Sequence, residues 1–422
     1  MRTLTPVGLF FCLLSFLTGC SSEQSTPDDR HRFTVTAKNG IETAVTTGGP
    51  AFDGELFRYE HVLTLQEDEA RAESLLSRPS VFTRDENGDH YVIDSAQKRI
   101  VVFDREGRYA RCFGRRGEGP GEFRYMMLQY VRGGIVSIWD YMTGRLTRLH
   151  TDGTLHDIVR KPLDFEYVPR GVWRTDENGL VVMRPFLVGS DSTSVTVASY
   201  DAGDRLIATL QSPELFDTVH LMSTIVGRTV SNPIPFAPFP TATYRPGRGI
   251  LVSPAHRPVL QWYDTRGELL SLIEIDCEDT LVTAEDQKKF TRLWADRLEE
   301  HPELSENIRT FGNTALLPQK KAAWTFIHID DAGYYWLRCN DQPYLDYAVT
   351  EGYRYYLLSP EGEYLGITRT PPEQLPNEAQ CHLIPVSVAH GYYMGISDDP
   401  DTGEKRLQVY RLVPEAEGFR YP

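Results

Sequence analysis

The chain has 422 residues, with 44 Lys and Arg residues against 59 Asp and Glu residues, and a formal net charge of −15 at pH 7. Such an acidic chain repels nucleic acid and anionic lipid head groups, so neither is an expected partner. Aromatic residues make up 11%, with 22 tyrosines, 33 glycines and 27 prolines, and long helical patterns are nearly absent. This profile is typical of an all-β fold with many turns.

The first 19 residues have the composition of an export signal. Arg2 is followed by an apolar run over residues 7–17, which is too short to span a bilayer stably. The run leads into Leu-Thr-Gly-Cys, ending at Cys20, which resembles the lipobox of bacterial lipoprotein signals. The resemblance implies cleavage before Cys20 and a lipid on its thiol, and two or more acyl chains give stable anchoring. The alternative is an ordinary signal peptide with a chance cysteine.

Residues 20–32 are polar and contain proline, as expected of a lipidated N-terminus with a flexible tether. Loss of residues 1–19 removes Arg2, their only charged residue, and changes the net charge from −15 to −16. The lipid, rather than a basic patch, must therefore hold the protein to the membrane. By analogy with other bacterial lipoproteins, Ser21 after the cysteine favours the outer membrane. Residues 33–422 are then the folded domain, which faces either the periplasm or the medium.

A unit of three strands joined by tight turns recurs along the chain. Its clearest copy begins at Arg78, turns at Asp85-Glu86-Asn87-Gly88, and has further strands that end at Asp94 and Asp104. Asn-Gly and Asp-x-x-Gly supply the positive φ that hairpins need, and β-branched and aromatic runs supply the strands. Asp94 stands at the turn between the second and third strands, and we expect its carboxylate to cap that turn.

Weaker copies give six units in total. They begin near Gly134, Asp176, Gly249, Asp330 and Gly391. Turn glycines at 107 and 153 are 46 residues apart and those at 153 and 203 are 50 apart, which fits one four-stranded blade, whereas later spacings of 64 and 95 indicate insertions. The pattern predicts an all-β, six-bladed β-propeller with a helical insertion. A strand from Phe33–Leu65 is expected to close the ring against the last blade.

The stretch from Arg78 to Phe123 resembles an NHL-type repeat. It ends in Gly-x-Gly-Pro-Gly-Glu-Phe, residues 117–123. A lipobox, an N-terminal strand and this signature occur in the same order in the six-bladed β-propeller lipoproteins of Bacteroidota, to which the chain is similar over about residues 39–150. Because that family is mostly without assigned activity, the resemblance implies architecture and location. The glycine run lacks a following Lys-Ser/Thr and helix, so we interpret it as a crossover between blades rather than a phosphate-binding loop.

Two insertions break the β pattern. Residues 283–312 begin with a helix-capping pattern at Thr283. The expected apolar helix face comprises Phe290, Leu293, Trp294 and Leu298. This segment is predicted to be a helical flap on a blade rim, or alternatively a lid or docking surface, with a second short helix after Pro302. The proline-rich insertion Phe216–Tyr244 is expected to be a loop without regular strands.

Motifs of catalysis, metal binding and cofactor binding are lacking in the sequence, so none of these is predicted. Three histidines are candidates for the central channel: His328, His382 and His390. Apart from Cys12 and Cys20, the cysteines are Cys112, Cys277, Cys339 and Cys381. Free thiols are at least as expected as a disulfide, and Cys339–Cys381 is the suggested pair if one forms.

The favoured function is a non-catalytic, membrane-tethered propeller that binds a ligand or protein partner in the cell envelope. The binding residues are expected to open each inner strand at the channel mouth. By repeat position they are Arg78, Tyr125, Arg170, Tyr244, Trp324 and His390. Arginine and aromatic groups together suit a carbohydrate, an acidic peptide or a protein loop. The alternatives are a channel-centred hydrolase or lyase acting on polysaccharide or peptide, and a structural subunit of an envelope complex.

Overall fold

The computed structural model describes the chain from residue 31 to its last residue, with gaps. The described residues are 31–140, 142–160, 169, 171–188, 192–210, 220–225, 228–233, 236–237, 241–254, 257–277, 280–300, 317–340, 348–349, 352–371, 373–374, 388–398 and 405–422. Cys20 with its signal and tether, Arg170, Cys381 and His382 lie outside them.

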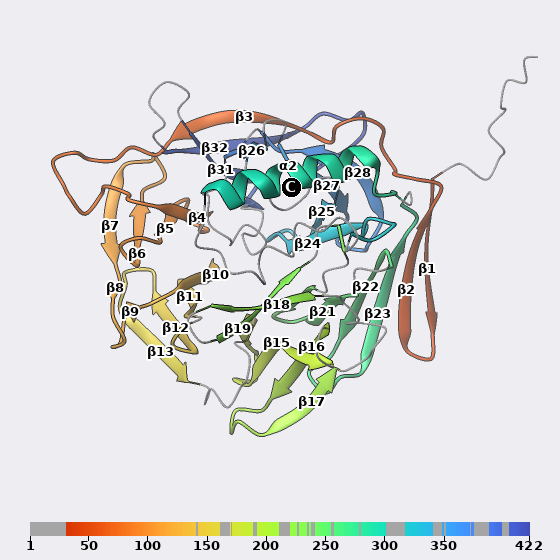
Figure 1. Ribbon diagram of the computed structural model, residues 1–422, viewed down its shortest axis with the longest axis horizontal. Coiled ribbons are helices and arrows are strands. Elements are labelled where there is room, and N and C mark those ends of the chain that lie inside the picture. The colour runs from red at the N-terminus through yellow and green to blue at the C-terminus, as the bar shows by residue number, and fades with distance from the viewer. Residues whose placement is uncertain are drawn as a thin grey trace, which may run out of the picture.

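Six antiparallel sheets, called blades 1 to 6, form a ring in this described part of the chain (Figure 1). Blade 1 comprises β4 (Pro79–Arg84), β5 (His90–Asp94), β6 (Arg99–Phe103) and β7 (Tyr109–Phe113). Blade 2 comprises β10 (Met126–Arg132), β11 (Ile135–Asp140), β12 (Arg145–His150) and β13 (Leu155–Arg160). Blade 3 comprises β14 (Gly171–Arg174), β15 (Leu180–Val188), β16 (Ser192–Tyr200) and β17 (Leu206–Leu210).

The later blades follow the same plan. Blade 4 comprises β20 (Thr241–Arg245), β21 (Gly249–Ser253), β22 (Val259–Tyr263) and β23 (Leu269–Ile275). Blade 5 comprises β24 (Trp324–Ile329), β25 (Tyr335–Cys339), β27 (Arg354–Leu358) and β28 (Tyr364–Arg369). Blade 6 comprises β30 (Val388–Ala389), β31 (Tyr392–Asp398), β32 (Lys405–Pro414) and, from the other end of the chain, β3 (Phe57–Thr64). The six-bladed propeller predicted from the repeats is confirmed.

The N-terminal residues form a belt around the outside of the ring. A hairpin of β1 (Arg32–Lys38) and β2 (Ile41–Thr47) extends blade 4, with β2 parallel to β23. The backbone N–H groups of Ala51 and Leu56 then donate to blade 5 carbonyls, and β3 pairs with β32. The expected closing strand is therefore β3 alone. The hairpin before it joins a different blade, a long-range pairing that alternation of residues does not reveal.

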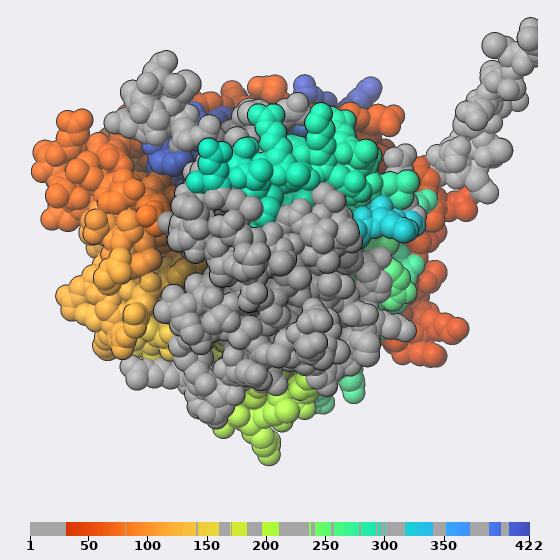
Figure 2. All heavy atoms as spheres, viewed as in Figure 1, coloured from red at the N-terminus to blue at the C-terminus, as the bar shows by residue number. Residues whose placement is uncertain are grey.

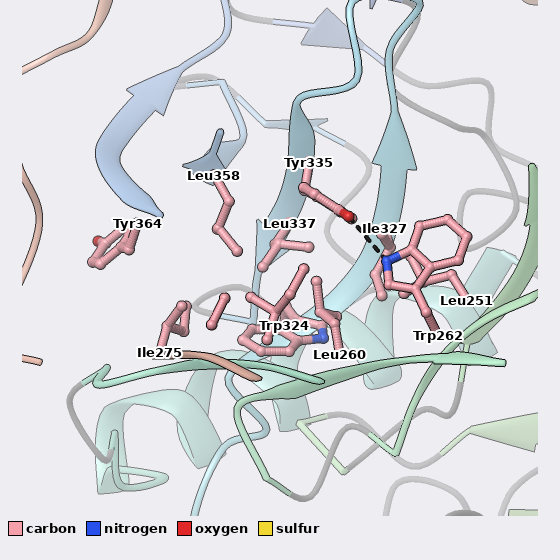
Figure 3. Packing of buried hydrophobic residues seen from close by; sticks show 12 residues of the cluster. Leu251, Leu260, Trp262, Ile275, Trp324, Ile327, Tyr335, Leu337, Leu358 and Tyr364 are labelled. Carbon is pink, nitrogen blue, oxygen red and sulfur yellow. Dashed lines mark hydrogen bonds between the residues drawn. The ribbon is translucent and has the colours of Figure 1, made fainter. Parts of the chain in front are cut away.

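Buried apolar residues form six clusters, and each cluster lies between two neighbouring blades. In β6, Ile100 and Val102 pack toward blade 2, whereas Val101 and Phe103 pack toward blade 6. Both faces of a blade are thus covered, which explains why strands such as β6 are continuously apolar. Figure 3 shows the cluster between blades 4 and 5, where the Trp262 indole N–H donates to the Tyr335 hydroxyl at 2.9 Å.

The ring has two different faces. The crossover face carries the connections from each outer strand to the next inner strand, and the turn face carries the tight turns that follow the inner strands. Both insertions follow outer strands, and the second contributes α2 (Ala284–Glu300), which lies on the crossover face (Figures 1 and 2). The first contains a hairpin of β18 (His220–Ile225) and β19 (Arg228–Pro233), so the expectation of no regular strand there is wrong. Its prolines cluster from Pro233 onward and leave the preceding residues free to pair.

The helix begins as the capping pattern predicts. The backbone N–H of Asp286 donates to Thr283 Oγ1, and the backbone N–H of Thr283 donates to Asp286 Oδ2. Phe290 and Trp294 are buried on its inner side. The expected second helix over residues 304–311 lies outside the described residues. Short strands complete the described fold: β8 (Arg115–Arg116), β9 (Glu122–Phe123), β26 (Ala348–Val349) and β29 (Glu373–Gln374).

Asp94 and its counterpart in blade 2, Asp140, fix the crossover ends of the first two blades. Asp94 Oδ1 accepts hydrogen bonds from the backbone N–H groups of Ala96 and Gln97, which confirms the predicted cap. The same carboxylate accepts from the backbone N–H of Arg78, where the chain enters β4. Asp140 repeats this arrangement with the backbone N–H of Tyr125 at the entry to β10. Each aspartate thus ties an incoming crossover to its own blade.

The glycine-rich signature is the crossover from blade 1 to blade 2, as interpreted from the sequence. Glu122 folds back so that its Oε2 accepts from the backbone N–H groups of Glu118 and Gly119. A Cβ atom at Gly117, whose φ is +156°, would meet the Glu122 carboxylate at 2.1 Å. Phe123 is fully buried beneath the loop. Because Cys381 lies outside the described residues, the suggested Cys339–Cys381 pair stays a prediction.

Candidate functional site

A cavity of about 490 Å³ occupies the channel and is bounded by residues from the inner strands of all six blades. Its apolar wall includes Phe82, Trp139, Trp173 and Phe326. Its polar groups stand mainly where the inner strands run into the turns, so they lie at the turn-face end. This position is opposite the crossover face, which carries α2.

Four arginines occupy one repeated position at this end. They are Arg84, Arg132, Arg174 and Arg245, called here the arginine arc. Each is the last residue of an inner strand, in blades 1, 2, 3 and 4 in turn, and each pairs with the first residue of the following strand. At this end blade 5 contributes His328, Asp330 and Asp331, and blade 6 contributes His390.

None of the four guanidinium groups forms a salt bridge with a carboxylate of the described residues, although Asp330 and Asp157 act on Arg245 and Arg174 over a longer distance. That of Arg84 lies 3.9 Å from the centre of the Tyr392 ring, and that of Arg132 lies 5.8 Å from the Tyr130 ring. Arg245 donates to the backbone carbonyls of Asp330 and Asp331. Burial lowers the pKa of Arg245 against the opposing effect of the Asp330 carboxylate, and the positive charges of Arg248 and Arg132 lower it further, although Arg245 remains protonated.

The acidic groups at the same end are, by contrast, all engaged. Asp330 is buried, and its carboxylate accepts from the Tyr334 backbone N–H, the Trp336 indole and the Tyr421 hydroxyl. Asp331 accepts from the backbone N–H of His390 at 2.6 Å and pairs with its imidazole. Glu86 accepts from the backbone N–H of Gly133 at 2.6 Å. The positive groups are therefore the ones left available to a ligand.

Contacts around the channel link neighbouring blades in a complete circuit. Blades 1 and 2 are joined by Glu86 with the Gly133 N–H, and blades 2 and 3 by the Gln129 amide with the Val172 carbonyl. Asp176 Oδ2 accepts from the Tyr244 hydroxyl between blades 3 and 4.

The other three contacts complete the circuit. Arg245 joins blades 4 and 5 through the Asp330 and Asp331 carbonyls. His390 joins blades 5 and 6 through Asp331, and the ring of Tyr392 in blade 6 stacks against Arg84 in blade 1. The mouth is thus rigidly framed, and a bound ligand contacts groups that are already positioned.

The two described channel histidines differ in charge behaviour. The hydrogen bond with Asp331 raises the pKa of His390 against the effect of burial. Burial lowers the pKa of His328, whose Nε2 lies 3.1 Å from the Val388 carbonyl oxygen. His390 is therefore the histidine that carries a positive charge at mildly acidic pH, beside the arginine arc.

The structure separates the residues predicted to open the inner strands. Tyr244 and His390 line the cavity. Arg78 and Tyr125 lie at the crossover end and do not line it, and their backbone N–H groups serve Asp94 and Asp140. Trp324 is buried between blades, with its indole N–H donating to Ser253 Oγ. Arg170 lies outside the described residues. Ligand binding by these residues remains a prediction.

Sequence reasoning missed the arginine arc. A signal was present, because an arginine precedes the turn in four consecutive repeats: Arg84-Asp85, Arg132-Gly133, Arg174-Thr175 and Arg245-Pro246. Among the described residues, no three or more His, Cys, Asp or Glu side chains are grouped to hold a metal ion. Within the same residues, no helix has the length and apolar character needed to cross a membrane.

Residues 70–150 match a protein family described as a 6-bladed beta-propeller. This agrees with the resemblance inferred from the glycine-rich signature. No curated protein matches the chain.

Solved structures of propellers are similar to the chain at low identity. A Bacteroides fragilis protein described as exported is 12% identical, with 85% of this chain and 96% of that chain covered and a TM-score of 0.46. A duf4221 family member from Bacteroides vulgatus is also 12% identical, with 86% and 99% covered and a TM-score of 0.46. Virginiamycin B lyase from Staphylococcus aureus is 11% identical, with 85% and 100% covered and a TM-score of 0.35. These similarities carry no argument about function.

Proposed function

We propose that this protein is an exported, lipid-anchored propeller of the cell envelope that binds a ligand or protein partner at the turn-face end of its channel, without transforming it. The observation that carries this proposal is the cavity bounded by all six blades, with four arginines at its mouth that form no salt bridge within the described part of the chain. Its volume of about 490 Å³ falls in the usual range for small-ligand sites, roughly 300–1,000 Å³. An exposed side chain or loop of a partner fits the same space.

The anchor is tested separately from the binding site. Lipid on Cys20 is the membrane contact that the lipobox implies, and the outer membrane is the proposed location. Cys20→Ser is expected to release an intact propeller into the soluble envelope fraction, while the native chain sediments with the membrane. Retention of Cys20→Ser in the membrane fraction, with unchanged thermal unfolding, would contradict the anchor.

Binding is tested by capture from the native envelope. The lipidated protein is purified with its bound components, which are identified by mass spectrometry, in parallel with an Arg132→Gln variant. Components that co-purify with the native protein and are depleted with the variant support binding at the mouth. An identical set from both proteins would contradict this position for the site.

One observation favours the alternative of a channel-centred hydrolase or lyase. The His390–Asp331 pair lines the same cavity, and a histidine held by a carboxylate is a common general base. Incubation of acidic and neutral polysaccharides with native protein and with His390→Asn separates the two functions. Products formed by the native protein and lost with the variant would replace the binding proposal with the enzymatic one.

A further inference from the structure

We infer that the turn-face mouth of the channel binds a small ligand carrying two or more carboxylate or phosphate groups, held by the arginine arc; this inference rests on the proposed function and specifies its ligand. The four residues of the arc lie on four consecutive blades. Their charges are therefore spread along one side of the opening, and separate acidic groups of one ligand can each meet a different arginine.

The first argument is the contrast with arginines elsewhere in the chain. The protein has a net charge of −15, so carboxylates are abundant. Outside the mouth, arginines commonly have carboxylate partners, as in Arg148–Asp157, Arg111–Asp89 and Arg205–Asp201. At the mouth, the acids are bound to backbone, aromatic or histidine donors, and no carboxylate of the described structure forms a salt bridge with the arc. Asp330 and Asp157 act on Arg245 and Arg174 only over a longer distance. A ligand anion supplies the missing charge.

The second argument is the closeness of like charges at the cavity. Arg132 and Arg245 both line it, and the positive charge of Arg132 contributes to lowering the pKa of Arg245. An anion bound between these groups would offset their repulsion.

The third argument concerns the chemical class of the ligand. Arginine forks bind carboxylate and phosphate in bidentate fashion, which favours acidic groups with two available oxygens over isolated hydroxyls. The aromatic residues Trp173 and Tyr130 in the same wall are only partly buried and provide apolar surface for a sugar ring or an aliphatic chain. Oligosaccharides of uronic acids and small multiply phosphorylated compounds both meet these requirements.

The experiment uses two anionic probes and one neutral probe. Trigalacturonate tests a ligand whose acidic groups are carboxylates, and inorganic pyrophosphate tests one whose acidic groups are phosphates. Neutral galactotriose has hydroxymethyl groups in place of the carboxylates, so it measures binding of the sugar alone. Dissociation constants are measured by calorimetry with the lipidated protein in detergent. Tightening at low salt is expected, because the interaction is between opposite charges.

The variants are Arg132→Gln and Arg174→Gln, with Arg205→Gln as the matched control. Arg132 is exposed, so its replacement leaves packing unchanged. Arg205 is paired with Asp201 on the turn face but does not line the cavity, and its loss gives the same change in net charge. Each variant in the arc is expected to raise the dissociation constant of the bound anion about 10-fold or more, whereas the control changes it less than about 2-fold.

Three results would overturn the inference. Equal affinity for trigalacturonate and galactotriose would show that the charge of the ligand does not contribute to binding. This result would overturn the inferred ligand class but not the proposed function. Anion binding that is unchanged in both arc variants would place the site elsewhere. No binding of either anion at millimolar concentration would reject the ligand class, whereas the proposed function is rejected only if envelope capture also fails. Binding of pyrophosphate but not of trigalacturonate would identify phosphate, rather than carboxylate, as the acidic group of the ligand.

Discussion

The imidazole Nδ1 of His390 lies 3.0 Å from Oδ2 of Asp331, and this contact joins blade 6 to blade 5 at the channel mouth. His390 has a φ of +52°, a conformation that Asn also tolerates. The contact closes one of the six blade-to-blade links beside the cavity. Its strength depends on the charge of both partners, so it responds to pH.

The pH dependence has a defined sign. The pKa of His390 is raised by its hydrogen bond with Asp331, so its stabilisation is complete below the ordinary histidine value near 6.5 and is lost as pH rises through the raised value. Burial opposes ionisation of Asp331, but its hydrogen bonds with His390 lower its pKa, so its contribution is lost only as pH falls below the ordinary value of 3.8. The link is strongest between about pH 4 and pH 6.5.

We predict that His390→Asn lowers the free energy of unfolding by about 0.5 kcal/mol near pH 5.5, a value reduced by solvent screening, and by less above pH 8. Thermal unfolding of both proteins across this range measures the difference. The charges of Glu86 and Arg84 also affect the pKa of His390, and the pKa values of His328 and His90 are themselves shifted. All four residues are present in both proteins, so they do not account for a difference between them. A difference that is constant with pH would contradict the assigned charge link.

The link between blades 3 and 4 has a neutral donor. Burial and Asp176 raise the pKa of Tyr244 to about 12, so its hydroxyl stays protonated and donates to Asp176 Oδ2 at 3.0 Å. The same hydroxyl accepts from the Asp176 backbone N–H. Tyr244→Phe is expected to cost about 1–2 kcal/mol and to accelerate exchange of the Asp176 amide hydrogen. The Gly179 amide, held by Thr175 Oγ1, is the internal control. Unchanged exchange at Asp176 would show that the link does not restrain the turn.

The architecture could be predicted from the sequence because it depends on local repetition. Each blade has β-branched and aromatic strands separated by turns with glycine, and Asp94 was identified as a turn cap from its position alone. The N-terminal belt could not be predicted in full, since pairing of β2 with β23 joins segments more than 200 residues apart. No local pattern specifies such a partner.

The candidate site was predicted less well, because it depends on where each inner strand begins. In blade 1 the strand begins just after Arg78, so Arg78 marks the crossover end. In blade 4 the insertion hides the start at Thr241, and Tyr244 was assigned to the opening of the strand although it stands near its end. The predicted binding residues therefore lie at both ends of the channel. The arginine arc has one repeated position because each of its members is the last residue before a turn.

Asp94 gives a strong test of the crossover ends. Its carboxylate is fully buried and accepts backbone N–H groups from Ser77, Arg78, Ala96 and Gln97. Asp94→Ala leaves these donors without an acceptor and is expected to cost about 3 kcal/mol, measured by urea unfolding. Asp104→Ala is the matched control, because Asp104 caps another turn of blade 1 with a partly exposed carboxylate, and about 1 kcal/mol is expected. Equal losses would contradict the crossover role.

Leu56 tests whether the N-terminal belt stabilises the ring rather than merely lying on it. Its side chain is fully buried between the belt and blades 5 and 6, and its Cδ2 lies 2.9 Å from the position of a Cβ atom at Gly366. Leu56→Ala is expected to destabilise the protein by about 3 kcal/mol, through lost burial and the cavity left behind. Val62→Ala is the control, because Val62 belongs to the same belt but is 45% exposed, and its loss should cost below about 0.5 kcal/mol.

Because β3 covers the edge of β32, the leucine variant should also expose blade 6 first, seen as early proteolysis near the C-terminus. Cleavage that begins instead in blades 1 to 3, or equal stability of the two variants, would show that the ring closes without the belt.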